Sequence, residues 1–293
     1  MARDTDDDEF EDRPRRRRDN DDDDDRDYAP PRKKGSSIGL ILGIIAGILV
    51  LVCGGGFAGL YFATSSVRDA ANRMKATNDA KQIGIGIDNY ESAHGAFPTN
   101  SYSQDGKPLL SWRVHILPFI EQENLYRQFN LAEPWDGPTN IRLLGQMPRT
   151  FAPVAEQNGG GASPSQTYYR GFSNPGTMFA RKEGPGKIGK KFDFENPFDA
   201  RLPKGVVRNK ITDGTSNTIM FLEAGTPVEW TKPDDLDASP GKPFPTLGGA
   251  RPKADTIIVA FADGSVRYVK KSIAESNWRA GTTVAGNDLA NFD

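Results

Sequence analysis

The feature that most constrains this chain is an uncharged run of 26 residues from Ile38 to Ala63. A bilayer core requires about 20 apolar residues in a helix, and at about 1.5 Å per residue this run would extend about 39 Å. A buried helix of a soluble protein usually has a polar face, which this run lacks. A cleaved secretory signal is shorter and begins closer to the N-terminus. We therefore expect a single transmembrane helix over residues 38–63.

Basic residues near the run indicate its orientation. The flank that is richer in lysine and arginine usually stays in the cytoplasm. Four basic residues precede the run closely and three follow it: Arg26, Arg32, Lys33 and Lys34, then Arg68, Arg73 and Lys75. We expect a single-pass protein of the cytoplasmic membrane, with its N-terminus in the cytoplasm and its C-terminal domain outside.

Residues 1–37 differ in composition from the rest of the chain. The first 34 residues hold 14 acidic and 10 basic side chains, a net charge of −4, and the remainder carries +2. Blocks of arginine at 15–18 and of aspartate at 21–25 leave almost no apolar surface to offset the entropy of ordering. We expect a disordered, charged cytoplasmic tail. It is either an interaction arm, a contact to lipid headgroups through residues 32–34, or a solvated flank.

Glycines recur within the uncharged run at every fourth position. Gly39, Gly43 and Gly47 lie on one face of a helix, where the absence of side chains allows a second helix to approach closely. Glycine is also frequent in membrane helices in general. The spacing favours self-association through the transmembrane helix as a hypothesis.

The uncharged run passes directly into an amphipathic helical pattern. Gly95 and Pro98 then supply stop signals. We expect a helix over residues 64–92 that continues the span, and a folded domain over residues 93–293. The expected apolar stripe of this helix consists of Val67, Ala70, Met74, Ala80, Ile83, Ile87 and Tyr90.

The rest of the chain mixes short helices with strands. Residues 109–129 have a helical pattern that Pro118 interrupts, and residues 167–172 and 218–223 have the character of strands. Residues 256–262 and 265–269 flank Asp263-Gly264, a dipeptide typical of tight hairpin turns. Residues 152–205 are rich in glycine and proline and indicate long loops. This order predicts an α+β fold with a mainly antiparallel sheet.

A series of motifs starts within the amphipathic helix and continues along the chain. Its residues are Asn78, Lys81, Gln82, Ile83, Gly84, Asn89, Tyr90, Gly95, Phe97, Pro98, Ser111-Trp112-Arg113-Val114, Leu117-Pro118, Glu121-Gln122, Leu125-Tyr126, Glu133-Pro134-Trp135-Asp136, 211–219, Glu223, Trp230, Pro233-Asp234-Asp235 and 261–268. The series resembles a large bacterial family of extracytoplasmic proteins with a pilin-like N-terminal helix, domain of unknown function family 1559. The resemblance covers nearly everything from about Val67 onward and implies a long helix packed on the sheet domain.

Two departures from the family pattern limit what the resemblance implies. Members commonly begin with a prepilin signal and a glutamate at the fifth mature position, but here Lys34-Gly35 leads into serines and apolar residues up to Leu40. We therefore expect a permanent anchor and no processing into a pilus. The family also has a histidine that nine residues separate from Asp-Gly; this chain has Lys253 at that position, and Arg251-Pro252 stands where members often have His-Pro. A metal or acid–base role of that histidine does not transfer.

Residues suited to catalysis are scarce. The only two histidines, His94 in the segment that ends the helix and His115 beside aromatic residues, are expected to be structural, and one cysteine excludes an internal disulfide. The Asp213-Gly214 and Asp263-Gly264 motifs indicate turns, since neither has the ligand spacing of a calcium loop. No phosphate loop, dinucleotide fingerprint or basic nucleic-acid patch follows the uncharged run. We expect no enzyme activity, cofactor, metal or nucleic-acid partner.

Three functions remain open. The first is a membrane-anchored, pilin-like structural or interaction protein outside the cytoplasm, with an envelope protein or glycan as partner. The second is an extracytoplasmic receptor for glycans or peptides, because aromatic rings beside carboxylates suit such ligands. The third is an envelope hydrolase that uses a pair of acids from the set Glu133, Asp136, Asp213, Glu223, Asp234 and Asp235. The candidate ligand-binding residues are Trp135, Asp136, Trp230, Asp234 and Asp235, although the two tryptophans also suit the core.

Overall fold

The computed structural model describes residues 37–153, 162–180, 202–288 and 290–292, and it leaves the side chains of residues 51–66 undescribed. Residues 1–36 of the expected tail lie outside these residues. So do residues 154–161 and 181–201 of the expected glycine- and proline-rich loops. The chain divides into two compact units, residues 1–58 and residues 59–293.

Helix α1 runs from Ile38 to His94. In the first unit its side chains at positions 38–50 are exposed. Within the described part of the chain, no helix is long and apolar enough to cross a membrane. The side chains at 51–63 that would complete the expected transmembrane helix over residues 38–63 lie outside the described residues, so the structure does not support that helix as a span.

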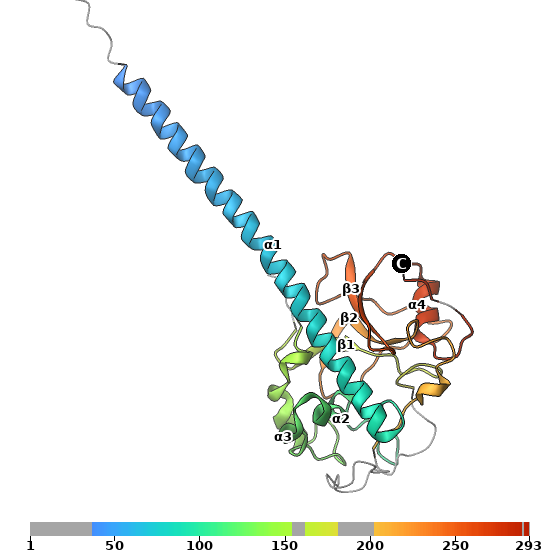
Figure 1. Ribbon diagram of the computed structural model, residues 1–293. Coiled ribbons are helices and arrows are strands. Elements are labelled where there is room, and N and C mark those ends of the chain that lie inside the picture. The colour runs from blue at the N-terminus through green and yellow to red at the C-terminus, as the bar shows by residue number, and fades with distance from the viewer. Residues whose placement is uncertain (1–36, 154–161, 181–201, 289, 293) are drawn as a thin grey trace, which may run out of the picture. The chain divides into compact units, whose positions relative to one another are not determined.

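The second unit is an α+β domain, as the sequence predicts (Figure 1). Its sheet has the order β1-β2-β3-β4, and every neighbouring pair is antiparallel. The elements that follow α1 are α2 Trp112–His115, η1 Leu117–Ile120, α3 Glu123–Tyr126, η2 Asn140–Gln146, η3 Arg149–Phe151, β1 Gln166–Arg170, η4 Arg208–Lys210, β2 Ile219–Glu229, β3 Thr256–Phe261, β4 Val266–Lys270 and α4 Glu275–Thr282.

The predicted hairpin at the C-terminal end is confirmed. Strands β3 and β4 pair in continuous antiparallel register from Thr256 opposite Lys270 to Ala260 opposite Val266. Gly264 has φ +80°, a conformation that residues with a Cβ rarely adopt, and Ser265 N donates a hydrogen bond of 2.8 Å to Asp263 Oδ1. The strand expected to end at residue 223 continues to Glu229.

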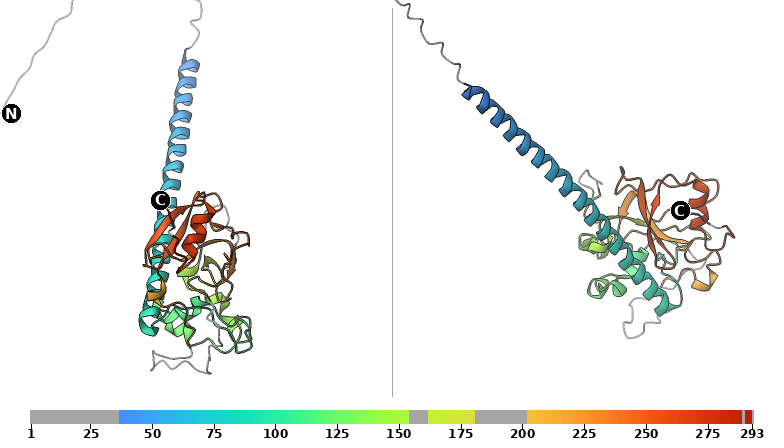
Figure 2. Two further views of the ribbon diagram at one scale, coloured as in Figure 1. Left: turned by 90° about the vertical axis from the view of Figure 1, so that its right-hand side faces the viewer. Right: turned by 45° about the horizontal axis from the view of Figure 1, so that its top comes forward.

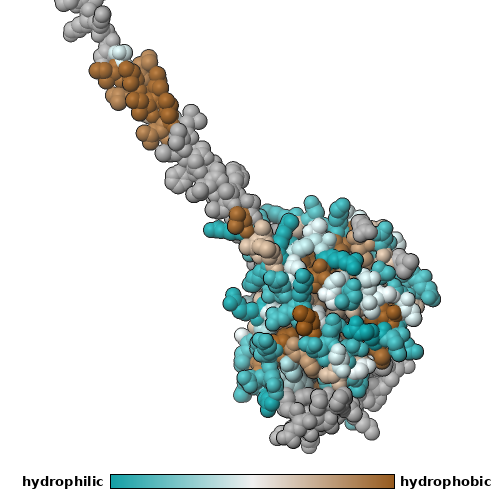
Figure 3. Space-filling model, in the orientation of Figure 1, coloured by the Kyte–Doolittle hydropathy of each residue, from teal (hydrophilic) through white to brown (hydrophobic). Residues whose placement is uncertain are grey.

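Two hydrophobic clusters lie on opposite faces of the sheet and produce three layers (Figure 2). Alternate residues of β3 point in opposite directions, so Ile258 contributes to the first cluster and Val259 to the second. Helices α1, α2, η1 and α3 cover the first cluster, and α4 covers the second through Trp278. On the side shown in Figure 3, hydrophilic side chains cover most of the surface of this unit.

The buried face of α1 differs in part from the predicted apolar stripe. Its buried apolar residues are Ala76, Ala80, Ile83, Ile87 and Tyr90. Val67 and Met74 were expected in the same stripe but are 68% and 64% exposed, and Ala70 is exposed too. The reason is the helical period, since Val67 and Met74 lie on the side of the helix opposite Ile83. The predicted stripe was therefore wrong for Val67, Ala70 and Met74, because it combined residues from different faces of the helix.

Contacts at the C-terminal end of α1 join it to the rest of the unit. A Cβ at Gly86 would lie 2.4 Å from Ile120 Cγ2, so glycine allows η1 to approach the helix closely. Arg208 of η4 pairs with Asp88 at 2.8 Å and with Glu91 at 3.1 Å. The helix ends before Gly95, which has φ +71°.

Candidate functional site

One half-buried aromatic residue lies within a cluster of charges at the surface of the second unit. The Lys232 Nζ atom lies 5.8 Å from the centre of the Trp135 ring, within the range of a cation–π contact. The same Nζ atom is 2.9 Å from Asp234 Oδ2, and Asp234 Oδ1 is 2.7 Å from Arg170 Nη2. We call these four residues, Trp135, Lys232, Asp234 and Arg170, the Trp135 patch. The patch combines an aromatic face with charges of both signs.

A tightly bonded turn holds Trp135 in place. Asn140 Nδ2 donates to the carbonyl oxygens of Asn130, Glu133 and Pro134 at 2.9, 3.0 and 3.1 Å. Glu133 Oε1 accepts a hydrogen bond of 2.7 Å from Thr139 N. Burial alone would raise the pKa of Glu133, but the hydrogen bonds it accepts outweigh that effect and lower its pKa. Glu133 is therefore an ionised support of the turn, and Asp136 is exposed on the same turn.

Arg170 connects the patch to the sheet. It is the last residue of β1, and its Nε donates to the backbone oxygen of Asp234 at 2.9 Å. Its Nη1 donates to Thr226 Oγ1 of β2 at 3.2 Å. The side chain of Arg170 is almost buried, whereas that of Asp234 is half exposed. Asp234 therefore retains access to solvent, although its carboxylate already has two cationic partners.

The next residue, Asp235, points into the interior and cannot contact a ligand in this structure. Its side chain is 0% exposed. Its carboxylate accepts hydrogen bonds from Asn100 Nδ2 at 2.8 Å, Trp112 Nε1 at 3.2 Å, Arg113 Nη2 at 3.4 Å and the backbone N of Gly171 at 3.2 Å. These bonds connect the loop after β2 to helix α2 and to the end of β1.

Arg113 is the charged partner that makes this network costly to disturb. The side chain is fully buried, its Nε donates to the backbone oxygen of Tyr169 at 2.9 Å, and its Nη1 donates to Ser111 Oγ at 2.6 Å. Burial lowers the pKa of Arg113 to about 10, although Asp235 acts in the opposite direction. The family motif at 111–114 thus serves the interior of the domain.

Trp230 is also an interior residue. It is fully buried, and its Nε1 donates to the backbone oxygen of Leu144 at 3.0 Å. The rings of Phe129 and Phe151 lie 5.7 and 6.0 Å from it. This arrangement fits the core-anchor alternative for Trp230 and leaves no face open to a ligand. Of the five candidate residues, the structure brings Trp135 and Asp234 together, leaves Asp136 exposed nearby in sequence, and buries the side chains of Trp230 and Asp235.

Two further candidate acids, Glu223 and Asp213, have structural partners. Glu223 Oε2 lies 2.5 Å from Arg251 Nη2 and accepts from Ile258 N at 3.0 Å, in a buried pair. Arg251, which stands where family members often have His-Pro, also lies over the Tyr268 ring at 5.3 Å. Asp213 accepts hydrogen bonds from Gly286 N at 2.7 Å and Asn287 N at 2.9 Å. In the described ranges no three metal-binding side chains cluster.

Both histidines are buried, and His94 lies beside aromatic rings. The Tyr90 ring lies 4.2 Å from that of His94, whose Nδ1 is 2.8 Å from the Tyr90 backbone oxygen. In the part of the chain that the structure describes, neither ring nitrogen of His115 has a hydrogen-bond partner. Burial, and secondarily the nearby His94, lower the pKa of His115 to about 3. His115 is therefore a neutral side chain at physiological pH.

Sequence reasoning missed Lys232 and Arg170. Lys232 is separated from Asp234 only by Pro233, so its proximity to the acids could have been recognised. Arg170 could not, because it reaches Asp234 across 64 positions through the pairing of β1 with β2.

Comparison with known proteins gives one match. A family model described as “Protein of unknown function (DUF1559)” matches residues 65–253, nearly two thirds of the chain. This confirms the resemblance seen in the motifs. The match ends before the hairpin turn, so the segment 261–268 lies beyond it. No curated protein and no solved structure matches the chain.

The two neighbouring aspartates should respond differently to removal of their charge. We expect Asp235→Asn to lower the free energy of unfolding by ~3–5 kcal/mol, because it leaves the buried Arg113 without a counter-ion. The matched change Asp234→Asn should cost less than about 1 kcal/mol, because the Asp234 side chain is half exposed and Arg170 keeps its hydrogen bonds to Thr226 and to the Asp234 backbone. Urea unfolding of both variants measures the difference, and equal effects would contradict the assigned roles.

His115 should contribute to instability in acid. Because its pKa is about 3 when folded and 6.5 ordinarily, the unfolded chain takes up the proton first as the pH falls. Folded stability therefore declines between these two values, by at most about 1.4 kcal/mol per pH unit. We expect His115→Leu to flatten the decline of the unfolding free energy between neutral pH and about pH 4. The parent chain and the variant contain the same carboxylates, so the difference between them reports on His115. If the free energy of unfolding falls with pH equally steeply in both proteins, His115 does not contribute.

Proposed function

Because this chain belongs to the family described as “Protein of unknown function (DUF1559)”, we propose that it is a membrane-anchored, pilin-like structural or interaction protein. Its α+β domain is displayed outside the cytoplasm, and the N-terminal tail stays in the cytoplasm. The observation that carries the proposal is the 57-residue helix α1, which begins in the uncharged run of the sequence and whose last turns contribute to the core of the domain.

The membrane anchor is supported by the sequence of the run itself. Between Ile38 and Ala63 no charged side chain occurs, and the length suffices for a bilayer of about 30 Å. The basic residues just before the run favour a cytoplasmic N-terminus. Without a prepilin signal or the glutamate of the fifth mature position, the anchor is permanent in this proposal.

The interior of the domain supports a role in display or interaction more than one in catalysis. Two of the candidate acids of a hydrolase have structural roles: Glu133 supports a turn, and Glu223 pairs with Arg251. A general acid requires a raised pKa, whereas the pKa of Glu133 is lowered. The buried polar groups are thus used to fix the loops around the sheet.

Reporter fusions test the topology. A reporter that is active only outside the cytoplasm should be active when it is fused after Asp293 and inactive when it replaces the tail before Lys33. A reporter that is active only in the cytoplasm should be inactive after Asp293 and active before Lys33, because the basic residues that flank the run set its orientation. Cytoplasmic activity after Asp293 would overturn the proposed anchor.

A second function, binding of a glycan or peptide, is favoured by the Trp135 patch. The half-exposed ring, the Lys232 ammonium and the Asp234 carboxylate offer stacking and charged hydrogen bonds within one small surface. The patch is held in position by the Asn140 turn and by Arg170, so a ligand would meet a preformed surface.

Ligand binding at the patch can be measured directly. A thermal-shift screen of the purified chain against envelope glycans and peptides should yield a stabilising ligand. For that ligand, Trp135→Ala should raise the dissociation constant roughly tenfold or more, because it removes the stacking surface. Arg127→Ala, an exposed change just after α3 and outside the patch, is the control. A screen without any stabilising ligand would contradict this second function.

A further inference from the structure

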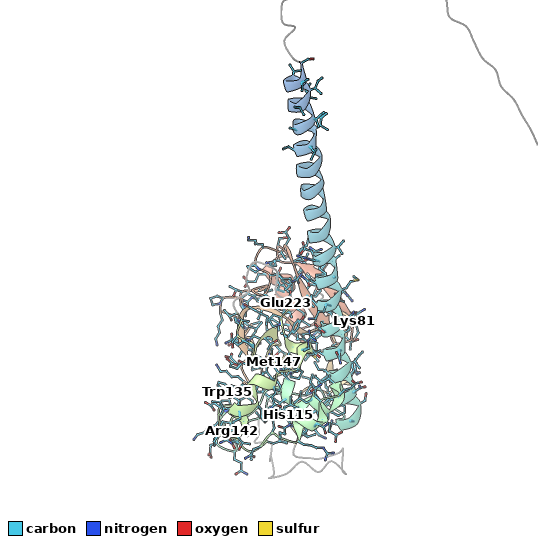
Figure 4. The ribbon with its side chains drawn as sticks, turned by 90° about the vertical axis from the view of Figure 1, so that its left-hand side faces the viewer. Lys81, His115, Trp135, Arg142, Met147 and Glu223 are labelled. Carbon is cyan, nitrogen blue, oxygen red and sulfur yellow. The ribbon has the colours of Figure 1, made fainter. Side chains whose placement is uncertain are left out.

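The outer side of α1 in the second unit carries a row of exposed residues. Val67, Met74 and Ile85 are 68%, 64% and 59% exposed, which is unusual for large apolar side chains on a helix that packs against its own domain. The full row, which we call the α1 seam, consists of Val67, Ala71, Met74, Asn78, Lys81, Ile85, Asn89 and Ser92, and all eight are exposed. In Figure 4, Lys81 projects outward from α1.

The spacing of the α1 seam is that of a helix-to-helix interface. From Val67 to Ile85 the steps alternate between four and three residues, as in the core positions of a coiled coil. One further step of four leads to Asn89, which is the pattern of a single stutter, and a step of three leads to Ser92. The seam lies opposite the buried face with Ile83 and Ile87, so the domain does not cover it.

The polar positions of the α1 seam fit a second copy of itself. Within the described residues the side-chain amides of Asn78 and Asn89 make no hydrogen bond, although each has donors and an acceptor. An amide is self-complementary, and asparagine pairs across a helix interface fix its register and favour two strands. Lysine at one such position likewise specifies the oligomeric state at some cost in stability.

The length of the α1 seam points to the same partner. A row of 26 residues on a helix matches a partner helix of about 39 Å. In the described part of the chain, α1 is the only helix longer than eight residues. We propose that two copies of this chain associate in parallel through their α1 seams, with Met74 and Ile85 against their counterparts and the asparagines paired between them.

The parallel direction rests on the proposed function, because two copies anchored in one membrane point the same way. Pairing through the α1 seam does not itself depend on the membrane anchor. This contact also differs from the association expected at Gly39, Gly43 and Gly47, which lie in the first unit. The two interfaces can therefore be tested separately.

Cysteine cross-linking of the full chain tests the seam. In a Cys53→Ser background, Met74→Cys and Ile85→Cys should form disulfide-linked dimers in detergent and in membranes. Arg73→Cys, which is exposed on the same helix but outside the seam, should not. Because these positions are exposed, the variants should fold like the parent chain. Equal cross-linking at Arg73 and Met74, or none at either seam position, would overturn the inference.

Charge substitutions and a mixing experiment complete the test. Met74→Asp and Ile85→Asp should each raise the dimer dissociation constant roughly tenfold or more, because symmetry places two like charges together, whereas Arg73→Asp should change it little. If the dimer persists in the Met74→Asp and Ile85→Asp variants but is absent in the double variant Gly43→Ile, Gly47→Ile, the copies pair elsewhere on α1. That result would contradict pairing through the α1 seam and would leave the proposed membrane-anchored function intact. Cross-links between Val67→Cys in one copy and Ser92→Cys in the other would mean an antiparallel pair and contradict the shared anchor.

Discussion

Burial of one face of α1 in the first hydrophobic cluster is the interaction on which the second unit depends. Ile83, Ile87 and Tyr90 are fully buried between the sheet and the short helices. Each such side chain contributes about 1.5–3 kcal/mol relative to an exposed one. The ion pairs of Arg208 with Asp88 and Glu91 are partly exposed and contribute at most about 1 kcal/mol each. Apolar burial therefore holds the helix, and the ion pairs only orient its end.

Two buried ion pairs join the loops to this framework. Asp235 with Arg113 fixes the loop after β2 against α2, and Glu223 with Arg251 fixes the chain before β3 against the middle of β2. A buried pair adds little net stability, because desolvation offsets the attraction, but a single charge left behind costs much. These pairs therefore restrict the loops to one arrangement. The interior uses acids that, from the sequence, also suited a ligand site.

Two surfaces of the second unit remain available for function. The Trp135 patch is small and charged, and tight hydrogen bonding of its turn preforms it. The α1 seam is long and partly apolar, and its spacing suits another helix. A protein that pairs through the α1 seam and presents the Trp135 patch would combine a structural role with a binding role. The seam requires a long surface that is complementary to another helix, whereas the patch requires a few side chains in fixed positions.

The sequence by itself determined the features that depend on neighbouring residues. The continuous helical pattern up to Gly95, the Asp263-Gly264 hairpin and the α+β class follow from periodicity and turn chemistry, and the motifs identified the family. Only the tertiary structure decided which face of α1 is buried and which aspartate, Asp234 or Asp235, points inward. Such choices depend on contacts between residues far apart in the chain, as between Asp235 and Arg113, and local spacing carries no information about them.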